Sequence, residues 1–232
     1  MTVARRWRGV LFDLDGTLAD TVELILTSYR HTMRTHLGEA PPDERWLSTM
    51  GTPLRDQLAA FARGPAEARA MLETYSTFQR RVHDEMVRPF PGACEVLGAL
   101  RAAGTRVGIV TSKREEVALR TLSVCGLEAH VETLVCAEHV RRGKPDPEAV
   151  DLALHALGLG DAAAETLFVG DSLFDLRAGR AAGTRTAAVC WGACTRETLA
   201  AEAPDYVLER LEDLLDPVAM AAAGEPSRSG RA

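Results

Sequence analysis

The feature that most constrains the fold is a series of short, continuous apolar runs, each followed by polar or reactive residues. These runs lie at residues 10–12, 107–110, 166–169 and 185–189, with a further short run at 133–136. Their apolar residues are continuous and do not alternate with polar ones, which is typical of strands buried on both faces of a sheet. Helical patterns lie between most of these runs. We therefore expect an α/β fold in which helices cover both faces of a parallel sheet.

Capping residues mark the helices between these strands. Glycines follow several of the helical patterns, as they commonly do at helix C-termini. Asp146 and Pro147 predict a helix start, with Asp as the N-cap and Pro at the first helical position. Ser172 is a second candidate N-cap. The helices expected in this part of the chain span residues 93–103, 115–125, 147–157 and 173–182.

Residues 19–89 break the alternation of strand and helix. This segment shows helical patterns at 21–37, 53–63 and 65–86 and no clear strand, and the core pattern resumes at Phe90. We therefore expect an all-helical cap inserted after the first strand. The expected domains are a catalytic core at 1–18 and 90–216, a cap at 19–89, and a disordered tail at 217–232, where most residues are small or polar.

Composition limits the class of protein. The 232 residues carry a formal net charge of -6, which argues against a nucleic-acid binder because phosphate backbones require a basic face. No stretch approaches the ~20 apolar residues of a membrane span, and no signal-peptide pattern is visible. The five cysteines show no CxxC zinc spacing. We expect a cytoplasmic protein with free thiols, either a monomer or a homodimer.

Three candidate site residues follow three of the expected strands. Asp13, Thr111 and Asp171 each stand where an apolar run ends. In open parallel sheets, ligands bind beyond the carboxyl ends of the strands. Segments that are far apart in the sequence should therefore converge on one site.

The carboxylates of this group predict a metal ion. Asp13 and Asp15 are two positions apart and would repel each other without a compensating cation. Mg²⁺ prefers hard oxygen ligands, and Asp171 offers a third carboxylate. Asp175 lies four residues further on, and on a helix that begins near Ser172 it would face back over Asp171 in a supporting or water-mediated role.

The other residues of the group suit a phosphoryl group. Thr111 and Ser112 offer hydroxyls, and Lys144 offers a compact positive charge in a turn stiffened by proline. Lys144 and Lys113 are the two lysines among 27 basic residues. Such isolation in an arginine-rich chain favours a functional role for Lys144. Lys113 would open a helix, where a cation is badly placed, and its role stays open between function and surface.

These parts suggest a mechanism. The Asp13 carboxylate attacks phosphorus in line and forms an aspartyl-phosphate. Mg²⁺ and Lys144 offset the repulsion between the two anions. Asp15 protonates the leaving oxygen and then accepts a proton from the attacking water.

The same residues resemble the four motifs of the haloacid dehalogenase superfamily in order and placement. The matching segments are Asp13-Leu14-Asp15-Gly16-Thr17, Thr111-Ser112, Lys144 and Gly170-Asp171-Ser172-Leu173-Phe174-Asp175. The resemblance implies a Rossmann-like core, a helical cap and Mg²⁺. It also implies that Asp13 is the nucleophile, that Asp15 is the acid/base and binds the metal through its backbone oxygen, and that Asp171 is a metal ligand.

Within the superfamily, the chain is similar to phosphoglycolate phosphatases and related bacterial pyrophosphatases. Residues 10–21, 23–25 and 143–147 carry this finer similarity. Arg55 resembles a cap-loop position that contacts substrate in relatives. The resemblance thus implies a phosphatase that hydrolyses a small phosphorylated metabolite, a phosphate monoester.

Several alternative functions remain to be weighed against this one. A phosphomutase of the β-phosphoglucomutase type would share every catalytic residue, and inorganic pyrophosphate is an alternative substrate. A dehalogenase is disfavoured because Asp15 has no role in that chemistry. A phosphonate hydrolase would need a cap lysine, which residues 19–89 lack. Intact motifs give no reason to expect a non-catalytic module. Phosphoglycolate, pyrophosphate, a sugar phosphate and an intermediate of specialised metabolism all stay open as substrates.

Overall fold

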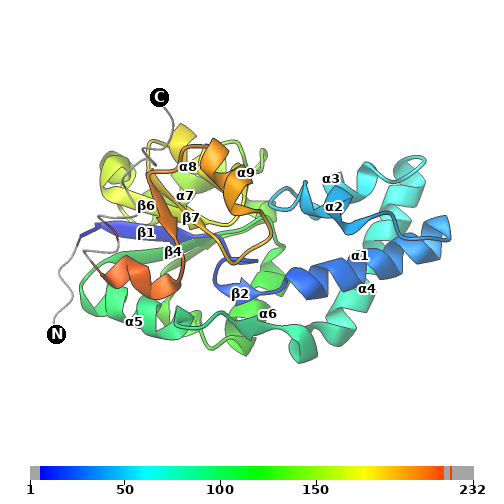
Figure 1. The fold of residues 1–232 in the computed structure, drawn as a ribbon, viewed down its shortest axis with the longest axis horizontal. Helices are drawn as coiled ribbons and strands as arrows, with labels where there is room; N and C mark the ends of the chain where they lie inside the picture. The colour runs from blue at the N-terminus through cyan, green and yellow to red at the C-terminus, as the bar shows by residue number, and fades with distance from the viewer. Residues whose placement is uncertain (1–5, 217–219, 221–232) are drawn as a thin grey trace, which may run out of the picture.

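A six-stranded parallel sheet forms the centre of the core domain (Figure 1). The computed structural model describes residues 6–216 and Met220. The strand order is β5-β4-β1-β6-β7-β8. β1 lies between β4 and β6, so that Leu11 pairs with Gly108 on one side and with Phe168 on the other. The strands are β1 (Gly9–Phe12), β4 (Arg106–Val110), β5 (Thr133–Val135), β6 (Thr166–Gly170), β7 (Arg185–Val189) and β8 (Tyr206–Leu208).

Helices cover both faces of the sheet, as expected. Val10 and Phe12 of β1 point into an apolar cluster with helices α5 (Ala93–Ala102) and α6 (Glu115–Val124). Leu11 lies in a second cluster, which contains residues of α7 (Glu148–Ala156) and of α8 (Leu173–Ala181). Successive side chains of a strand alternate between faces, so a continuous apolar run is buried from both sides. The remaining core helix, α9 (Arg196–Ala201), follows β7, and short 3-10 helices are η1 (Glu128–His130), η2 (Ala137–His139), η3 (Gly160–Glu165) and η4 (Leu211–Leu215).

The predicted helix caps are close to those observed. Ser172 caps α8, since its side chain accepts a hydrogen bond from the backbone N–H of Asp175, whose carboxylate in turn bonds the Ser172 N–H. Helix α7 begins at Glu148, one residue later than expected. The N-cap residue is therefore Pro147 and not Asp146 as predicted, although Asp146 Oδ1 still accepts a hydrogen bond from the Glu148 N–H at 3.0 Å.

The insertion after β1 forms a helical cap at one end of the molecule (Figure 1). Its helices pack around an apolar cluster that includes Tyr29, Met33, Trp46, Leu58 and Met71. The Tyr29 and Trp46 rings are stacked, with centroids 4.6 Å apart. The cap helices are α1 (Val22–Leu37), α2 (Asp43–Leu47), α3 (Leu54–Ala59) and α4 (Pro65–Met86). Because the cap has its own core, it can pack as a unit on the sheet domain.

Three details of the cap and the sheet differ from the sequence prediction. The expected absence of strands in 19–89 was wrong, because β2 (Ala19–Asp20) and β3 (Arg88–Pro89) form an antiparallel pair where the cap joins the core. The helix expected at 53–63 is shorter, since α3 ends at Ala59. Helix α2 and edge strand β8 were not predicted, because five and three residues are too few to show a period.

Two further expectations concern the tail and the thiols. The expected disordered tail lies outside the described residues except for Met220, which is buried in the apolar cluster that contains Val10 and Phe12.

All five cysteines are unpaired in the structure. Among the described residues, no helix is long and apolar enough to cross a membrane. The positions 18/19 and 89/90 stay our proposed domain boundaries.

Candidate active site

The three strand ends predicted from the sequence meet at one edge of the sheet. Asp13 follows β1, Thr111 follows β4 and Asp171 follows β6, and these three strands are neighbours. Backbone hydrogen bonds continue the sheet at this edge, since the Asp13 N–H donates to the Val169 carbonyl at 2.9 Å. All three side chains are buried. The predicted convergence of these segments is therefore present in the structure.

Lys144 lies at the centre of this group. Its Nζ donates to Asp13 Oδ1 at 2.7 Å, to Asp175 Oδ1 at 2.5 Å and to the Val110 carbonyl at 3.3 Å. The three N–H groups of the ammonium therefore each have an acceptor. Burial alone would lower the pKa of Lys144, but the charges of Asp13 and Asp175 raise it above its ordinary value. The ammonium is thus a permanent positive charge beside the predicted nucleophile.

The remaining carboxylates are held by the start of α8 and the loop after β7. Asp175 Oδ2 accepts hydrogen bonds from Ser172 N–H at 3.1 Å and from Ser172 Oγ at 2.5 Å. Asp171 Oδ2 accepts one from the Ala193 N–H at 2.7 Å. Asp175 was expected in a supporting or water-mediated role; in the structure it contacts Lys144 directly, and its role stays a prediction.

The carboxylates of Asp13, Asp171 and Asp175 form a group that fits a magnesium ion. One oxygen of each lies within 4.8 Å of the others, and all three side chains are buried. Burial and repulsion by the neighbouring carboxylates hold the pKa of Asp13 well above its usual range. The same two causes raise the pKa of Asp171 to about 7. Hard oxygen donors that repel one another suit Mg²⁺, because the cation removes the repulsion.

Two glycines allow the chain to approach Asp171 closely. A Cβ at Gly16 or at Gly192 would overlap the Asp171 carboxylate. Gly16 also has a φ of +77°, a left-handed conformation that side chains disfavour. The loops after β1 and β7 therefore enclose this carboxylate, and they can do so because glycine stands at both positions.

Asp15 is positioned by two residues outside the central group. Its Oδ1 accepts hydrogen bonds from Thr21 Oγ1 at 2.6 Å and from Lys113 Nζ at 2.5 Å. The Lys113 side chain is 7% exposed, which answers the question that the sequence left open: this lysine lies in the site and not on the surface. Sequence reasoning did not single out Thr21. Metal binding by the backbone oxygen of Asp15 stays a prediction.

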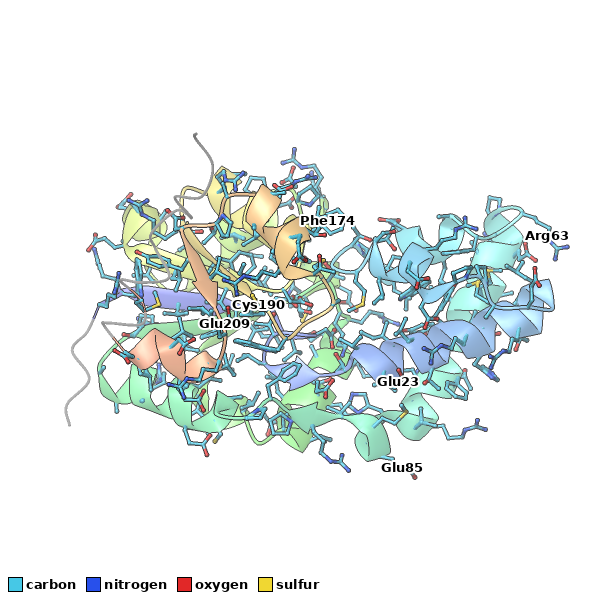
Figure 2. All side chains as sticks on the ribbon, viewed as in Figure 1. Glu23, Arg63, Glu85, Phe174, Cys190 and Glu209 are labelled. Atoms are coloured by element: carbon cyan, nitrogen blue, oxygen red, sulfur yellow. The ribbon has the colours of Figure 1, made fainter. Side chains whose placement is uncertain are left out.

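The predicted phosphate ligands lie near the site with different partners. Thr111 Oγ1 accepts a hydrogen bond from the Lys113 N–H at 3.2 Å. Ser112 Oγ donates to the carbonyl of Gly51 in the cap at 2.5 Å, so this hydroxyl links the core to the cap. Phe174, which is labelled in Figure 2, lies on the same side of the core, with its ring against Gly51. Phosphate binding by Thr111 and Ser112 stays a prediction.

A cavity of about 630 Å³ lies between the cap and this edge of the sheet. Core residues Asp13, Asp15, Thr111, Lys144 and Asp171 contribute to its wall, and so does Arg55 of the cap. The Arg55 side chain is 81% exposed and pairs with Asp56 at 3.5 Å. Further basic side chains line the cavity, namely Arg80, Lys113, Arg114, Arg120 and Arg141. Carboxylates line the cavity as well, and Glu116 and Glu138 pair there with Arg80 and Arg114, so basic and acidic side chains share its wall.

Comparison with known proteins identifies the family. A model of haloacid dehalogenase-like hydrolases matches residues 10–189. The chain belongs to this family. The match begins in β1 and ends with β7, so it covers every catalytic residue named from the sequence, and it confirms the resemblance stated above.

Curated relatives match nearly the whole chain. Pyrophosphatase PpaX of Bacillus velezensis is 39% identical over 211 residues, which are 91% of this chain and 96% of the relative. Pyrophosphatase PpaX of Bacillus pumilus is 38% identical over 206 residues, 89% of this chain and 94% of the relative.

Solved structures agree on the fold. A haloacid dehalogenase-like hydrolase from Bacteroides fragilis superimposes with a TM-score of 0.82 at 26% identity, over 90% of this chain and 99% of that one. A predicted phosphoglycolate phosphatase from Haemophilus somnus has a TM-score of 0.81 at 21% identity, over 90% and 97%. The Rossmann-like core with an inserted helical cap is therefore confirmed.

Proposed function

We propose that this hydrolase is a Mg²⁺-dependent phosphatase that cleaves a small phosphorylated metabolite through an aspartyl-phosphate on Asp13. The observation that carries the proposal is the buried ammonium of Lys144, which contacts both Asp13 and Asp175. A nucleophilic carboxylate that must approach an anionic phosphoryl group needs a fixed cation beside it. Lys144 supplies that cation at 2.7 Å from Asp13 Oδ1.

Each residue has a defined part in this reaction. Asp13 attacks phosphorus, and the bond between phosphorus and the leaving oxygen breaks as the aspartyl-phosphate forms. Asp15 donates a proton to the leaving oxygen and later takes one from the water that hydrolyses the intermediate. Asp13, Asp171 and the backbone oxygen of Asp15 would hold Mg²⁺, with the Asp175 carboxylate within 4.8 Å of the other two carboxylates, and the ion would neutralise charge on the phosphoryl oxygens.

Inorganic pyrophosphate is the second candidate substrate. The relatives that share up to 39% identity with this chain carry the name pyrophosphatase. Basic side chains such as Arg55 and Arg141 line the cavity beyond Lys144, and they would pair with a second anionic group on the substrate. A phosphate monoester with a carboxylate, or pyrophosphate itself, would use these charges.

A substrate panel tests the proposal. The purified full chain would be assayed for phosphate release from pyrophosphate, phosphoglycolate, several sugar phosphates and p-nitrophenyl phosphate, with Mg²⁺ or with EDTA. We expect release that requires Mg²⁺ and that is lost in Asp13→Asn. Unchanged turnover in Asp13→Asn would refute the mechanism. Conversion of a sugar phosphate to its isomer without free phosphate would establish a phosphomutase instead.

A further inference from the structure

We propose that Lys113 is a positioning residue for the acid/base Asp15, and that Thr121 and His83 connect it to the cap. The inference rests on the proposed function, because it assigns Asp15 the transfer of a proton to the leaving group. It adds a residue whose place the sequence left open. It also adds a physical link between the acid/base and a cap helix.

The two oxygens of the Asp15 carboxylate have different surroundings. Thr21 Oγ1 and Lys113 Nζ both donate to Oδ1, at 2.6 Å and 2.5 Å. Among the described residues, no hydrogen bond to Oδ2 is present. With Oδ1 occupied by two donors, Oδ2 is the oxygen that can carry a proton to the leaving group. Two donors on one oxygen also prevent the carboxylate from rotating, which fixes the direction of proton transfer.

Lys113 is itself held in place by several contacts. Its side chain is 7% exposed, and Nζ also donates to Thr121 Oγ1 at 3.3 Å. Its backbone N–H donates to Thr111 Oγ1 at 3.2 Å, just beyond the end of β4. A flexible lysine at the surface could not orient a carboxylate, but one anchored at both backbone and ammonium can.

Hydrogen bonds through Thr121 connect this lysine to the cap. Thr121 lies on core helix α6, and its Oγ1 is 3.0 Å from Nε2 of His83 on cap helix α4. His83 is fully buried, and its Nδ1 is 2.8 Å from Asp84 Oδ1. Arg120 of α6 donates to the same Asp84 oxygen at 2.7 Å. The chain of contacts thus runs from the end of α4 to Asp15, through both the cap and the core.

A neighbouring arginine provides the matched control. Arg114 follows Lys113 in the chain and also lines the cavity. Its Nε donates to Glu138 Oε1 at 2.9 Å, and no contact with Asp15 is found among the described residues. Replacing Arg114 therefore removes one positive charge from the same wall without changing the bonds of Asp15. A general effect of charge on substrate would appear in both variants, and a positioning effect in Lys113 variants alone.

The experiment compares two substrates of similar shape that differ in their need for a proton. Phenyl phosphate releases a phenol whose pKa is about 10, like that of tyrosine, whereas p-nitrophenol is a far stronger acid and leaves readily as the anion. We would measure kcat/KM for both in wild type, Lys113→Met and Arg114→Met. For Lys113→Met we expect a loss of about 10- to 100-fold on phenyl phosphate, and a loss at least several-fold smaller on p-nitrophenyl phosphate.

A pair of threonine variants tests the outer link. Thr121→Val removes the hydroxyl that Lys113 and His83 contact, and Thr121→Ser keeps it. We expect Thr121→Val to lower phenyl phosphate turnover several-fold more than p-nitrophenyl phosphate turnover, and Thr121→Ser to preserve the wild-type ratio. This pair also keeps the proposal testable if Lys113→Met does not fold.

The outcomes separate this inference from the proposed function. Equal losses on both substrates in Lys113→Met, or an equal change of the ratio in Arg114→Met, would overturn the positioning role. An unchanged ratio in Thr121→Val would overturn the link to the cap. If wild type hydrolysed neither substrate, or if Asp13→Asn kept its activity, it would be the proposed function that failed.

Discussion

Replacing Asp171 by asparagine should stabilise the metal-free protein and weaken its stabilisation by Mg²⁺. Asp171 is buried beside Asp175, and these surroundings raise its pKa from 3.8 to about 7. The asparagine side chain has the same shape, carries no charge and can still accept the hydrogen bond that the Ala193 N–H donates. The substitution therefore removes a buried repulsion and leaves the packing in place.

The sign and size of the expected stability change follow from the link between proton binding by Asp171 and the free energy of unfolding. The folded protein binds the Asp171 proton more tightly than the unfolded chain does, so the free energy of unfolding falls as pH rises from about 4 to about 7. A pKa rise from 3.8 to about 7 corresponds to at most roughly 4 kcal/mol, at about 1.4 kcal/mol per pH unit. The uncharged amide of asparagine does not cause this destabilisation, which reaches its full size in wild type above pH 7.

Urea unfolding in EDTA at several pH values measures the difference. We expect Asp171→Asn to be more stable than wild type at pH 8, and the gap to close towards pH 4. A gain of 1 kcal/mol would shift Tm by about 2–4 °C in a chain of this size. Mg²⁺ should stabilise wild type by binding the folded state and should stabilise the variant less. A variant less stable than wild type at pH 8 in EDTA would refute the reasoning.

Three further substitutions test other parts of the site. Gly192→Ala places a Cβ against the Asp171 carboxylate, so it should cost about 1–3 kcal/mol of stability and weaken Mg²⁺ binding, as seen by thermal shift against Mg²⁺ concentration. Ser112→Ala removes the hydrogen bond to the Gly51 carbonyl. We expect KM to rise several-fold and the free energy of unfolding to fall by about 0.5–1.5 kcal/mol. Arg55→Ala, at a largely exposed cavity side chain, should raise KM up to about tenfold with little change in kcat or Tm, since it removes an ionic contact with substrate; a fall in kcat alone would contradict a binding role.

The convergence of three candidate site residues could be predicted because it depends on strand direction. Asp13, Thr111 and Asp171 end parallel strands, and parallel strands put all their carboxyl ends at one edge. The sequence did not state the strand order, but short right-handed connections leave few possible orders. In the structure β1 lies between β4 and β6, so the three residues are immediate neighbours.

The contacts of side chains on helices could not be predicted in the same way. Thr21 precedes α1, and His83 lies near the end of α4, positions with no special pattern in the sequence. Their roles depend on how the cap sits on the core, which decides that His83 Nε2 meets Thr121 Oγ1 at 3.0 Å. Helical periodicity predicts which face is apolar, and it carries no information about a single polar contact between two helices of different domains.

The rarity of lysine in this chain favoured a functional role for Lys144 and left the role of Lys113 open. They are two of the 27 basic residues of an otherwise arginine-rich chain, and both lie buried against carboxylates of the candidate site. The ammonium of Lys144 donates to three acceptors, and its side chain is 1% exposed. The ammonium of Lys113 donates to two acceptors, and its side chain is 7% exposed. A compact ammonium can direct its three N–H groups to acceptors on different sides, whereas the planar guanidinium of arginine is larger and presents its donors in one plane. The same geometric demand therefore explains why lysine stands at both positions, and it makes Lys113 a part of the site as much as Lys144.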